Sequence, residues 1–221
     1  MSKYIIGDVH GSFLTLVDLM YKIFEDGGTY ADVVLVGDLI DRGPKSRQVV
    51  EYVMGNNIAC VLGNHELMMI DWENSGDHEE GVWTRNGGTD TLASYGSKGQ
   101  LFKDHVKFLN TLPMFLEYSE CKNAVGEHLL VTHSAAGDVW GLDPKDPKFI
   151  NALLWDRNAN PFPIDGIFNV FGHTPKQEPV IGKWWANVDT GACFVRGDYG
   201  KLTALKYPEM TIIQQENVDN D

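Results

Sequence analysis

Cysteine and basic residues are in short supply in this sequence. It has three cysteines, which lie far apart and form no Cys-x-x-Cys pair: Cys60, Cys121 and Cys193. That pattern excludes a disulfide framework and a zinc–thiolate site. The 18 lysines and arginines stand against 31 aspartates and glutamates, which gives a net charge of −13. A chain this acidic is a poor partner for the nucleic-acid backbone or for an anionic membrane surface, so we expect neither partner.

Long apolar stretches are also missing. No run approaches the ~20 residues that a membrane-spanning helix needs. The first three residues lead directly into a short strand-like run at 4–7, which is too short for the apolar region of a signal peptide. Together with the three scattered cysteines, which suit a reducing compartment, this absence leads us to expect a cytoplasmic location. The assembly state is left open, with a monomer as the default.

The order of the apolar patterns predicts an α/β fold. The 221 residues suit one domain, 1–221. Early strand-like and helix-like stretches alternate, which is typical of a sheet with helices on its faces; they are 4–7, 13–24, 33–36, 45–54 and 58–62. Later strand-like runs follow one another closely and predict a second, mixed or antiparallel sheet. We expect an excursion near the active site at about 71–99 and a polar tail at about 214–221.

Five apolar runs end in side chains that can bind a metal ion. In open α/β sheets, ligands bind beyond the carboxyl ends of the strands, so we expect these side chains to meet at one edge. They are Asp8 with His10, Asp38, Asn64 with His65, His133, and His173. Glycine, which allows close backbone approach, comes directly before the polar residue in four of the five runs.

The charges of these side chains favour two metal ions. Asp8 and Asp38 would supply two negative charges, whereas the amide and imidazole ligands are neutral. Two divalent cations would leave a net positive site that suits a phosphate group and can activate water. Mixed oxygen and nitrogen ligands fit manganese, iron or zinc without choosing between them.

The motifs that carry these residues resemble those of the PPP-type metallophosphatases, the serine/threonine protein phosphatase family. Gly-Asp-Val-His-Gly at 7–11, Gly-Asp-Leu-Ile-Asp-Arg-Gly at 37–43 and Gly-Asn-His-Glu at 63–66 match its three signature motifs in order and spacing. His133 and Phe-Gly-His-Thr-Pro at 171–175 are similar to its two downstream histidine motifs. Within the family, the chain is most similar to the small phage and bacterial enzymes like the bacteriophage lambda phosphatase.

The resemblance implies a calcineurin-like metallophosphoesterase fold, a β-sandwich flanked by helices with a dimetal site at the strand edge. It assigns one metal to Asp8, His10 and Asp38, and the other to Asp38, Asn64, His133 and His173, with manganese as the expected ion. It makes His65 the general acid and Asp41 the group that orients it. It gives Arg42, Arg157 and Asn64 contacts with the substrate phosphate.

The function predicted from this resemblance is that of a metal-dependent phosphomonoesterase. It would hydrolyse phosphoserine and phosphothreonine, with a range extending to phosphotyrosine and aryl phosphates, by direct attack of a metal-bound hydroxide. The expected partner is a phosphoprotein or phosphopeptide.

Two alternatives stay open. Enzymes like the symmetrical diadenosine tetraphosphate hydrolases share the metal ligands but typically have Ala at the position of Asp41 and Asp at that of Glu66. Both differences favour the phosphatase, whereas Pro44 favours the hydrolase. A catalytically inactive, metal-dependent binding module is the other alternative, but Asp41, His65 and both arginines are present.

Overall fold

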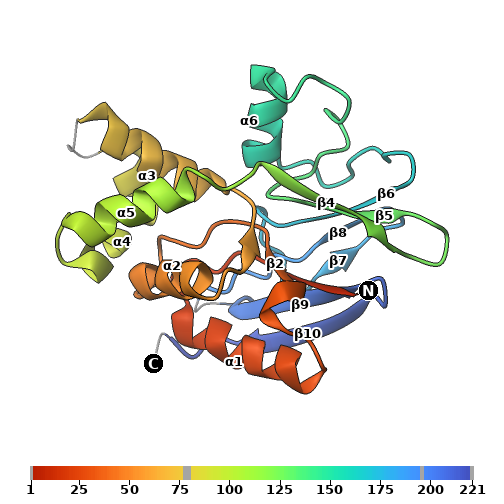
Figure 1. Cartoon of the computed structure of the whole chain (residues 1–221), viewed down its shortest axis with the longest axis horizontal. Helices are drawn as coiled ribbons and strands as arrows, with labels where there is room; N and C mark the ends of the chain where they lie inside the picture. The colour runs from red at the N-terminus through yellow and green to blue at the C-terminus, as the bar shows by residue number, and fades with distance from the viewer. Residues whose placement is uncertain (1, 77–80, 195–196, 220–221) are drawn as a thin grey trace.

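The computed structural model describes residues 2–76, 81–194 and 197–219 (Figure 1). Two five-stranded sheets lie against each other, and helices cover their outer faces. This arrangement confirms the predicted α/β fold with a sandwich of two sheets.

The first sheet has the strand order β10-β9-β1-β2-β3. β1, β2 and β3 are parallel. On the other side of β1, β9 pairs with it in antiparallel fashion, and β10 in turn pairs antiparallel with β9. In register, Ile5 pairs with Val34 on one side and with Leu205 on the other. The strands are β1 (Lys3–Ile6), β2 (Val33–Leu35), β3 (Ala59–Cys60), β9 (Lys201–Tyr207) and β10 (Thr211–Glu216).

The second sheet has the order β4-β5-β6-β8-β7 and is mixed, as predicted. β5, β6 and β8 run parallel to one another, while β4 and β7 are antiparallel edge strands. The strands are β4 (Phe115–Lys122), β5 (His128–Thr132), β6 (Ile167–Phe171), β7 (Val180–Ile181) and β8 (Trp185–Asn187).

Alternating apolar residues of both sheets fill the space between them. Because successive strand residues point to opposite faces, Ile5 and Val34 of the first sheet meet Val131 and Val170 of the second in one fully buried cluster. Packing of both sheets against this cluster fixes how their strand ends meet, and therefore where the strand-end side chains lie.

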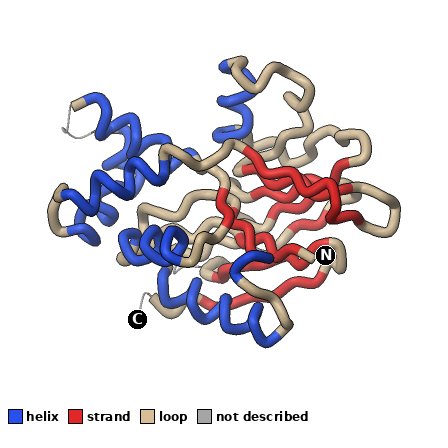
Figure 2. Tube along the Cα trace, in the orientation of Figure 1, coloured by secondary structure: helices blue, strands red, loops and turns tan. Residues whose placement is uncertain are grey.

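Helices cover the two outer faces unequally. α1 and α2 pack against the first sheet in a second apolar cluster, which α3 and α5 extend beyond β3 (Figures 1 and 2). Among the described helices, α6 packs on the second sheet. The helices are α1 (Phe13–Glu25), α2 (Ser46–Gly55), α3 (Asn64–Ser75), α4 (Thr89–Tyr95), α5 (Gln100–Leu109) and α6 (Pro147–Trp155), with a 3-10 turn at Tyr30–Asp32 and a π-helical turn at Thr84–Gly88. No helix among the described residues is long and apolar enough to cross a membrane.

The segment expected to be a polar tail is ordered as far as residue 219. Residues up to 216 belong to β10, and the buried Asp219 carboxylate accepts hydrogen bonds from the backbone N–H groups of Leu14 and Thr15 at 3.0 and 2.9 Å. These are unpaired donors in the first turn of α1, so Asp219 caps that helix from across the chain. Lys45 Nζ lies 3.1 Å from the same carboxylate. Residues 220–221 lie outside the described part.

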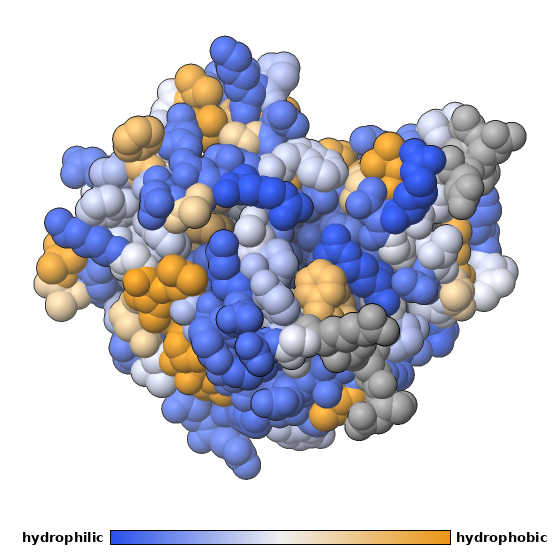
Figure 3. Space-filling model, turned by 180° about the vertical axis from the view of Figure 1, so that it is seen from behind, coloured by the Kyte–Doolittle hydropathy of each residue, from blue (hydrophilic) through white to orange (hydrophobic). Residues whose placement is uncertain are grey.

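The surface carries the acidic, polar character expected from the composition. Seen from behind, most of the molecule is hydrophilic, with hydrophobic groups in small separate patches (Figure 3).

The described part of the expected 71–99 excursion contains the end of α3, the π-helical turn and α4. Residues 77–80 of that excursion lie outside the described residues.

Candidate active site and metal centre

The strand-end side chains from both sheets meet at one edge of the sandwich. Asp38 is their centre, because its carboxylate faces imidazoles that come from either sheet. Its Oδ2 lies 3.5 Å from His10 Nε2, and its Oδ1 lies 3.5 Å from His133 Nε2. The structure brings together all six residues predicted to hold metal, and each is buried: Asp8, His10, Asp38, Asn64, His133 and His173.

The backbone that presents these side chains is strained. His10, Asp38, Asp41, Arg42 and His173 have φ angles of 44°, 48°, 75°, 66° and 68°, in the left-handed region that residues with a Cβ rarely adopt. Such residues persist only where the surrounding structure holds them, and they concentrate at functional sites.

Glycine allows the close packing that these turns require. A Cβ at Gly172 would lie 2.1 Å from Asp8 Oδ1. The backbone N–H of the next residue, His173, donates to both oxygens of the same carboxylate at 3.1 and 3.2 Å. The carboxylate therefore packs directly against the backbone of the turn after β6.

One group of candidate ligands lies between the two sheets. Asp38, His133 and His173 have ligand atoms within 4.8 Å of one another. Asn64 Oδ1 joins them, 2.9 Å from His133 Nε2 and 3.0 Å from His173 Nδ1. The set combines one carboxylate, one amide oxygen and two imidazoles.

The hydrogen bonds of His133 show that this group lacks a positive partner. Its Nδ1 must donate to the Val36 carbonyl at 2.8 Å, so the neutral ring directs the Nε2 lone pair at the oxygens of Asn64 and Asp38. Burial lowers the pKa of His133. Burial also lowers the pKa of His173, and the nearby His133 lowers it further, to about 3. Both rings are therefore neutral near pH 7. His173 Nε2 is buried without a partner. A cation among these lone pairs would satisfy them, and the chemistry of the set therefore fits a divalent metal.

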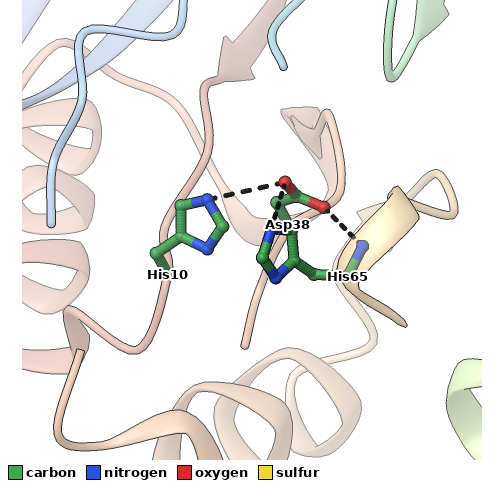
Figure 4. Close-up of side chains that lie close together, drawn as sticks. All are labelled: His10, Asp38 and His65. Carbon is green, nitrogen blue, oxygen red and sulfur yellow. Dashed lines mark hydrogen bonds and ion pairs between the residues drawn. The ribbon is translucent and has the colours of Figure 1, made fainter. Parts of the chain in front are cut away.

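A second group shares Asp38 with the first. His10, Asp38 and His65 also place ligand atoms within 4.8 Å of one another (Figure 4). His10 Nδ1 donates to the Ile40 carbonyl at 2.8 Å, which leaves its Nε2 lone pair facing the Asp38 carboxylate. Burial lowers the pKa of His10 well below its ordinary value, so this ring is neutral as well.

Asp8 lies beside these groups rather than within either of them. Burial, followed by the charges of Asp189 and Asp38, raises the pKa of its carboxyl well above the ordinary value. Asp189 is buried too, and burial raises its pKa to about 6. Three acidic side chains in one buried site repel one another, and cations would relieve that repulsion.

His65 is held by a carboxylate on the side away from Asp38. Its Nδ1 lies 2.6 Å from Asp41 Oδ2, and its Nε2 is 3.9 Å from Asp38 Oδ2. Burial would lower the pKa of His65, but Asp38 and Asp41 outweigh burial and raise it. The pair has the geometry of an imidazole whose ring orientation is fixed by a carboxylate.

The excursion after α3 supplies the groups that hold Asp41. Trp83 Nε1 donates to both Asp41 oxygens at 3.1 and 2.9 Å, and the Thr91 hydroxyl donates to Oδ1 at 2.6 Å. The Asp41 backbone N–H in turn donates to Thr91 Oγ1 at 2.9 Å. Every one of these groups is buried, so the Asp41–His65 pair is set in a closed polar network.

We predict that Trp83→Phe lowers kcat about tenfold. The change keeps the aromatic bulk but removes the N–H that orients Asp41. In metal sites, loss of a group that hydrogen-bonds to a functional side chain lowers activity roughly 10–100-fold. Steady-state kinetics of Trp83→Phe would be compared with Trp140→Phe, whose ring packs on α6 instead. An unchanged kcat in a normally folded Trp83→Phe protein would contradict this positioning role.

The two arginines expected to contact phosphate lie on different sides of the site. The Arg42 guanidinium reaches His10 Nε2 at 2.6 Å and His65 Nε2 at 3.0 Å. Its backbone packs against Gly87, where a Cβ would lie 2.8 Å from Arg42 N. Arg157 follows α6 and is exposed. Its positive charge adds to the lowering of the pKa values of His133 and His173.

Glu66 has a structural task. Its carboxylate accepts hydrogen bonds from the backbone N–H groups of Asp38, Leu39 and Gly63 at 2.8, 2.8 and 3.0 Å. Burial, with the nearby Asp38 charge, raises its pKa to about 8. Glu66 therefore fixes the turn that presents Asp38, and it is fully buried.

Sequence reasoning did not assign three residues that belong to this site. Asp189 follows the apolar stretch after β8, so the strand-end pattern that indicated the other ligands could have found it. Trp83 and Thr91 carried no such signal, because they lie 42 and 50 residues from Asp41 in a segment without a clear pattern.

The fold and the site together define a class of protein. The family model described as "Calcineurin-like phosphoesterase" matches residues 1–213. The chain belongs to this family of metallophosphoesterases.

Two related sequences carry named activities. The symmetrical bis(5'-nucleosyl)-tetraphosphatase of Buchnera aphidicola is 48% identical over 174 residues, which cover 76% of this chain and 56% of that protein. The asymmetrical bis(5'-nucleosyl)-tetraphosphatase PrpE of Bacillus cereus is 27% identical over 240 residues, covering 96% of this chain and 93% of that protein. The chain thus spans a little over half the length of the Buchnera relative.

Solved structures share the fold at low identity. One is a protein provisionally assigned as a diadenosine tetraphosphatase, with a TM-score of 0.70, 18% identity, and coverage of 99% of this chain and 95% of that one. A serine/threonine phosphatase of Saccharomyces cerevisiae has a TM-score of 0.61 and 14% identity, with 100% and 81% coverage.

These comparisons correct the predicted activity. The prediction of a protein serine/threonine phosphatase with a phosphoprotein partner is wrong, because the related sequences are named as bis(5'-nucleosyl)-tetraphosphatases. Glu66 was one of two residues that favoured the phosphatase, yet it faces the backbone of the Asp38 turn and carries no information about the substrate. The alternative of a tetraphosphate hydrolase is the better supported one.

Proposed function

We propose that this protein hydrolyses bis(5'-nucleosyl) tetraphosphates with the help of two divalent cations. The observation that carries the proposal is the sharing of Asp38 by two groups of candidate ligands, with Arg42 alongside. The substrate class comes from the named relatives. We assign one cation to Asp8, His10 and Asp38, and the other to Asp38, Asn64, His133 and His173. Manganese is the ion to test first, with iron and zinc next.

The charge of the chain explains why a polyphosphate substrate would require bound cations. Four linked phosphates bring several negative charges to a chain whose net charge is −13. Bound cations would offset this repulsion and activate a water molecule for attack on phosphorus. Arg42 and Arg157 would hold phosphate oxygens, since a guanidinium fork can bind two of them at once.

His65 would complete the reaction at the leaving group. Water adds to one phosphorus and loses a proton to solvent, and the phosphoanhydride P–O bond breaks. The departing nucleotide oxygen accepts a proton from His65, which then takes up a proton from solvent. Asp41, fixed by Trp83 and Thr91, keeps the ring in the orientation that this transfer needs.

We expect His65→Asn to lower kcat roughly 10²-fold, the lower end of the usual range for general acid catalysis. A terminal phosphate has a second pKa of about 6, so a nucleotide leaves with less help than an alkoxide would. Assays on bis(5'-adenosyl) tetraphosphate measure this loss, with His128→Asn as a control on an exposed edge contact to Glu117. A His65→Asn enzyme as fast as the wild type would remove His65 from the mechanism.

A substrate comparison tests the proposed activity. Manganese-loaded protein would be given bis(5'-adenosyl) tetraphosphate, a phosphoserine peptide and p-nitrophenyl phosphate under identical conditions. We expect the dinucleotide to have the highest kcat/KM. Chromatography of the products then separates symmetrical cleavage, which yields ADP alone, from asymmetrical cleavage, which yields ATP and AMP. Faster turnover of the phosphopeptide would refute the proposal.

A further inference from the structure

A cavity of about 230 Å³ opens on the outer face of the second sheet. α6 covers this face over β5 and the start of β6, where Phe149 and Leu153 pack on Leu130 and Ile167. The cavity lies farther along the sheet, over β6, β8 and β7. Its lining includes Arg157, Phe171, Thr174, Lys176, Trp185 and Asn187.

The cavity shares a wall with the candidate metal centre. Two residues of the cavity lining flank the candidate ligand His173 in the chain: Phe171 lies two residues before His173, and Thr174 directly follows His173. Asn187 Nδ2 donates to the Thr174 carbonyl at 2.9 Å, which ties this wall to β8. Arg157 lines the cavity two residues after Trp155, whose ring lies 6.4 Å from the His173 ring between centroids. A molecule bound to the metal ligands could therefore extend past Arg157 into the cavity.

The aromatic part of the lining is held in place. The Trp185 ring packs so closely on Gly182 that a Cβ there would lie 2.7 Å from Trp185 Cε2. The Phe171 ring is 5.7 Å from it between centroids, tilted by 32°. On the opposite side, Trp184 Nε1 donates to the Pro161 carbonyl at 3.2 Å and anchors the loop that carries Arg157. The cavity is thus formed before any ligand binds, which lowers the entropic cost of binding.

We propose that this cavity, the nucleoside pocket, receives one base of the dinucleotide substrate; the inference rests on the proposed function. Its volume is below the roughly 300–1,000 Å³ that encloses a drug-sized ligand, so it suits one planar group rather than a whole nucleotide. Trp185 and Phe171 offer aromatic surface for the base, and Asn187 and Lys176 offer polar groups.

The test compares substrates with and without a base. For bis(5'-adenosyl) tetraphosphate relative to inorganic tetraphosphate, we expect Trp185→Leu to reduce the ratio of kcat/KM values about tenfold, through KM. Trp185→Phe, which keeps an aromatic ring, should recover most of that ratio. Tyr21→Leu removes an aromatic ring that is 64% exposed on α1 and serves as the matched control.

A binding measurement avoids dependence on the variants. Titration of AMP into the wild-type protein, followed by amide NMR, should shift resonances of residues 171–176 and 185–187. AMP shifts confined to other parts of the chain would overturn the pocket. So would an unchanged substrate ratio in a folded Trp185→Leu protein that still hydrolyses the dinucleotide. If the wild type does not hydrolyse the dinucleotide at all, the proposed function fails instead, which the substrate comparison reveals separately.

Discussion

Removal of divalent ions by a chelator is expected to reduce hydrolysis of bis(5'-adenosyl) tetraphosphate to background, and Mn²⁺ should restore it. Without cations, the polyphosphate meets the buried carboxylates of Asp8, Asp38 and Asp189. Arg42 and Arg157 alone cannot offset that charge. Activity assays with elemental analysis of the chelated and reloaded protein measure the effect.

Thermal unfolding gives an independent measurement of the same site. A ligand present at 100 times its Kd adds about 2.7 kcal/mol to the free energy of unfolding. For a chain of this size, that is a rise in Tm of roughly 5–10 °C. Full activity in protein shown to be free of metal would refute the dimetal proposal, whatever the change in Tm.

Asp38→Asn is expected to lower kcat about 10³-fold or more, because Asp38 alone belongs to both groups of candidate ligands. Loss of a residue that only orients a metal ligand lowers metal affinity or activity roughly 10–100-fold. Loss of a ligand shared by two ions should lower kcat further. The asparagine keeps the shape of the side chain but removes a charge placed between two cations. Elemental analysis should find fewer than two metal ions per chain.

Asn64→Asp is the matched control for Asp38→Asn, since it makes the reverse change in the first group. It adds a negative charge there, so it should retain metal while lowering kcat through weaker phosphate binding. Without metal, Asp38→Asn should fold normally, because asparagine keeps the shape of the side chain and its Oδ1 can still accept the hydrogen bond from the His65 backbone N–H. Two metal ions per chain and normal activity in Asp38→Asn would disprove the bridging assignment.

The cluster of candidate metal ligands could be predicted from sequence because one physical rule places most of it. Parallel strands that share an edge bring their carboxyl ends together, so polar residues after apolar runs meet there. Asp38 and His133 come from different sheets, yet the rule predicted both, and the structure places them 3.5 Å apart.

The groups around Asp41 could not be predicted in this way. The contact between Trp83 and Asp41 joins segments 42 residues apart, and it depends on how the π-helical turn packs beside α2 and α4. No local periodicity encodes such a contact.

The substrate could not be predicted for a related reason. The signature motifs encode the handling of phosphate and metal, which mono- and polyphosphate hydrolases share. In our proposal, selectivity depends on the pocket around Trp185, whose residues match no motif.

The pairing of β1 with β9 sets an order of events during synthesis. Ile5 pairs with Leu205, 200 residues later in the chain, and Asp219 completes the first turn of α1. At about 5–20 residues per second, a ribosome needs roughly 10–40 s to make the later partner. During that time β1 lacks one neighbour, and the loop bearing Asp8 and His10 lacks its final support. β1 is therefore among the last strands of the first sheet to gain both of its neighbours, although it is made before all of them.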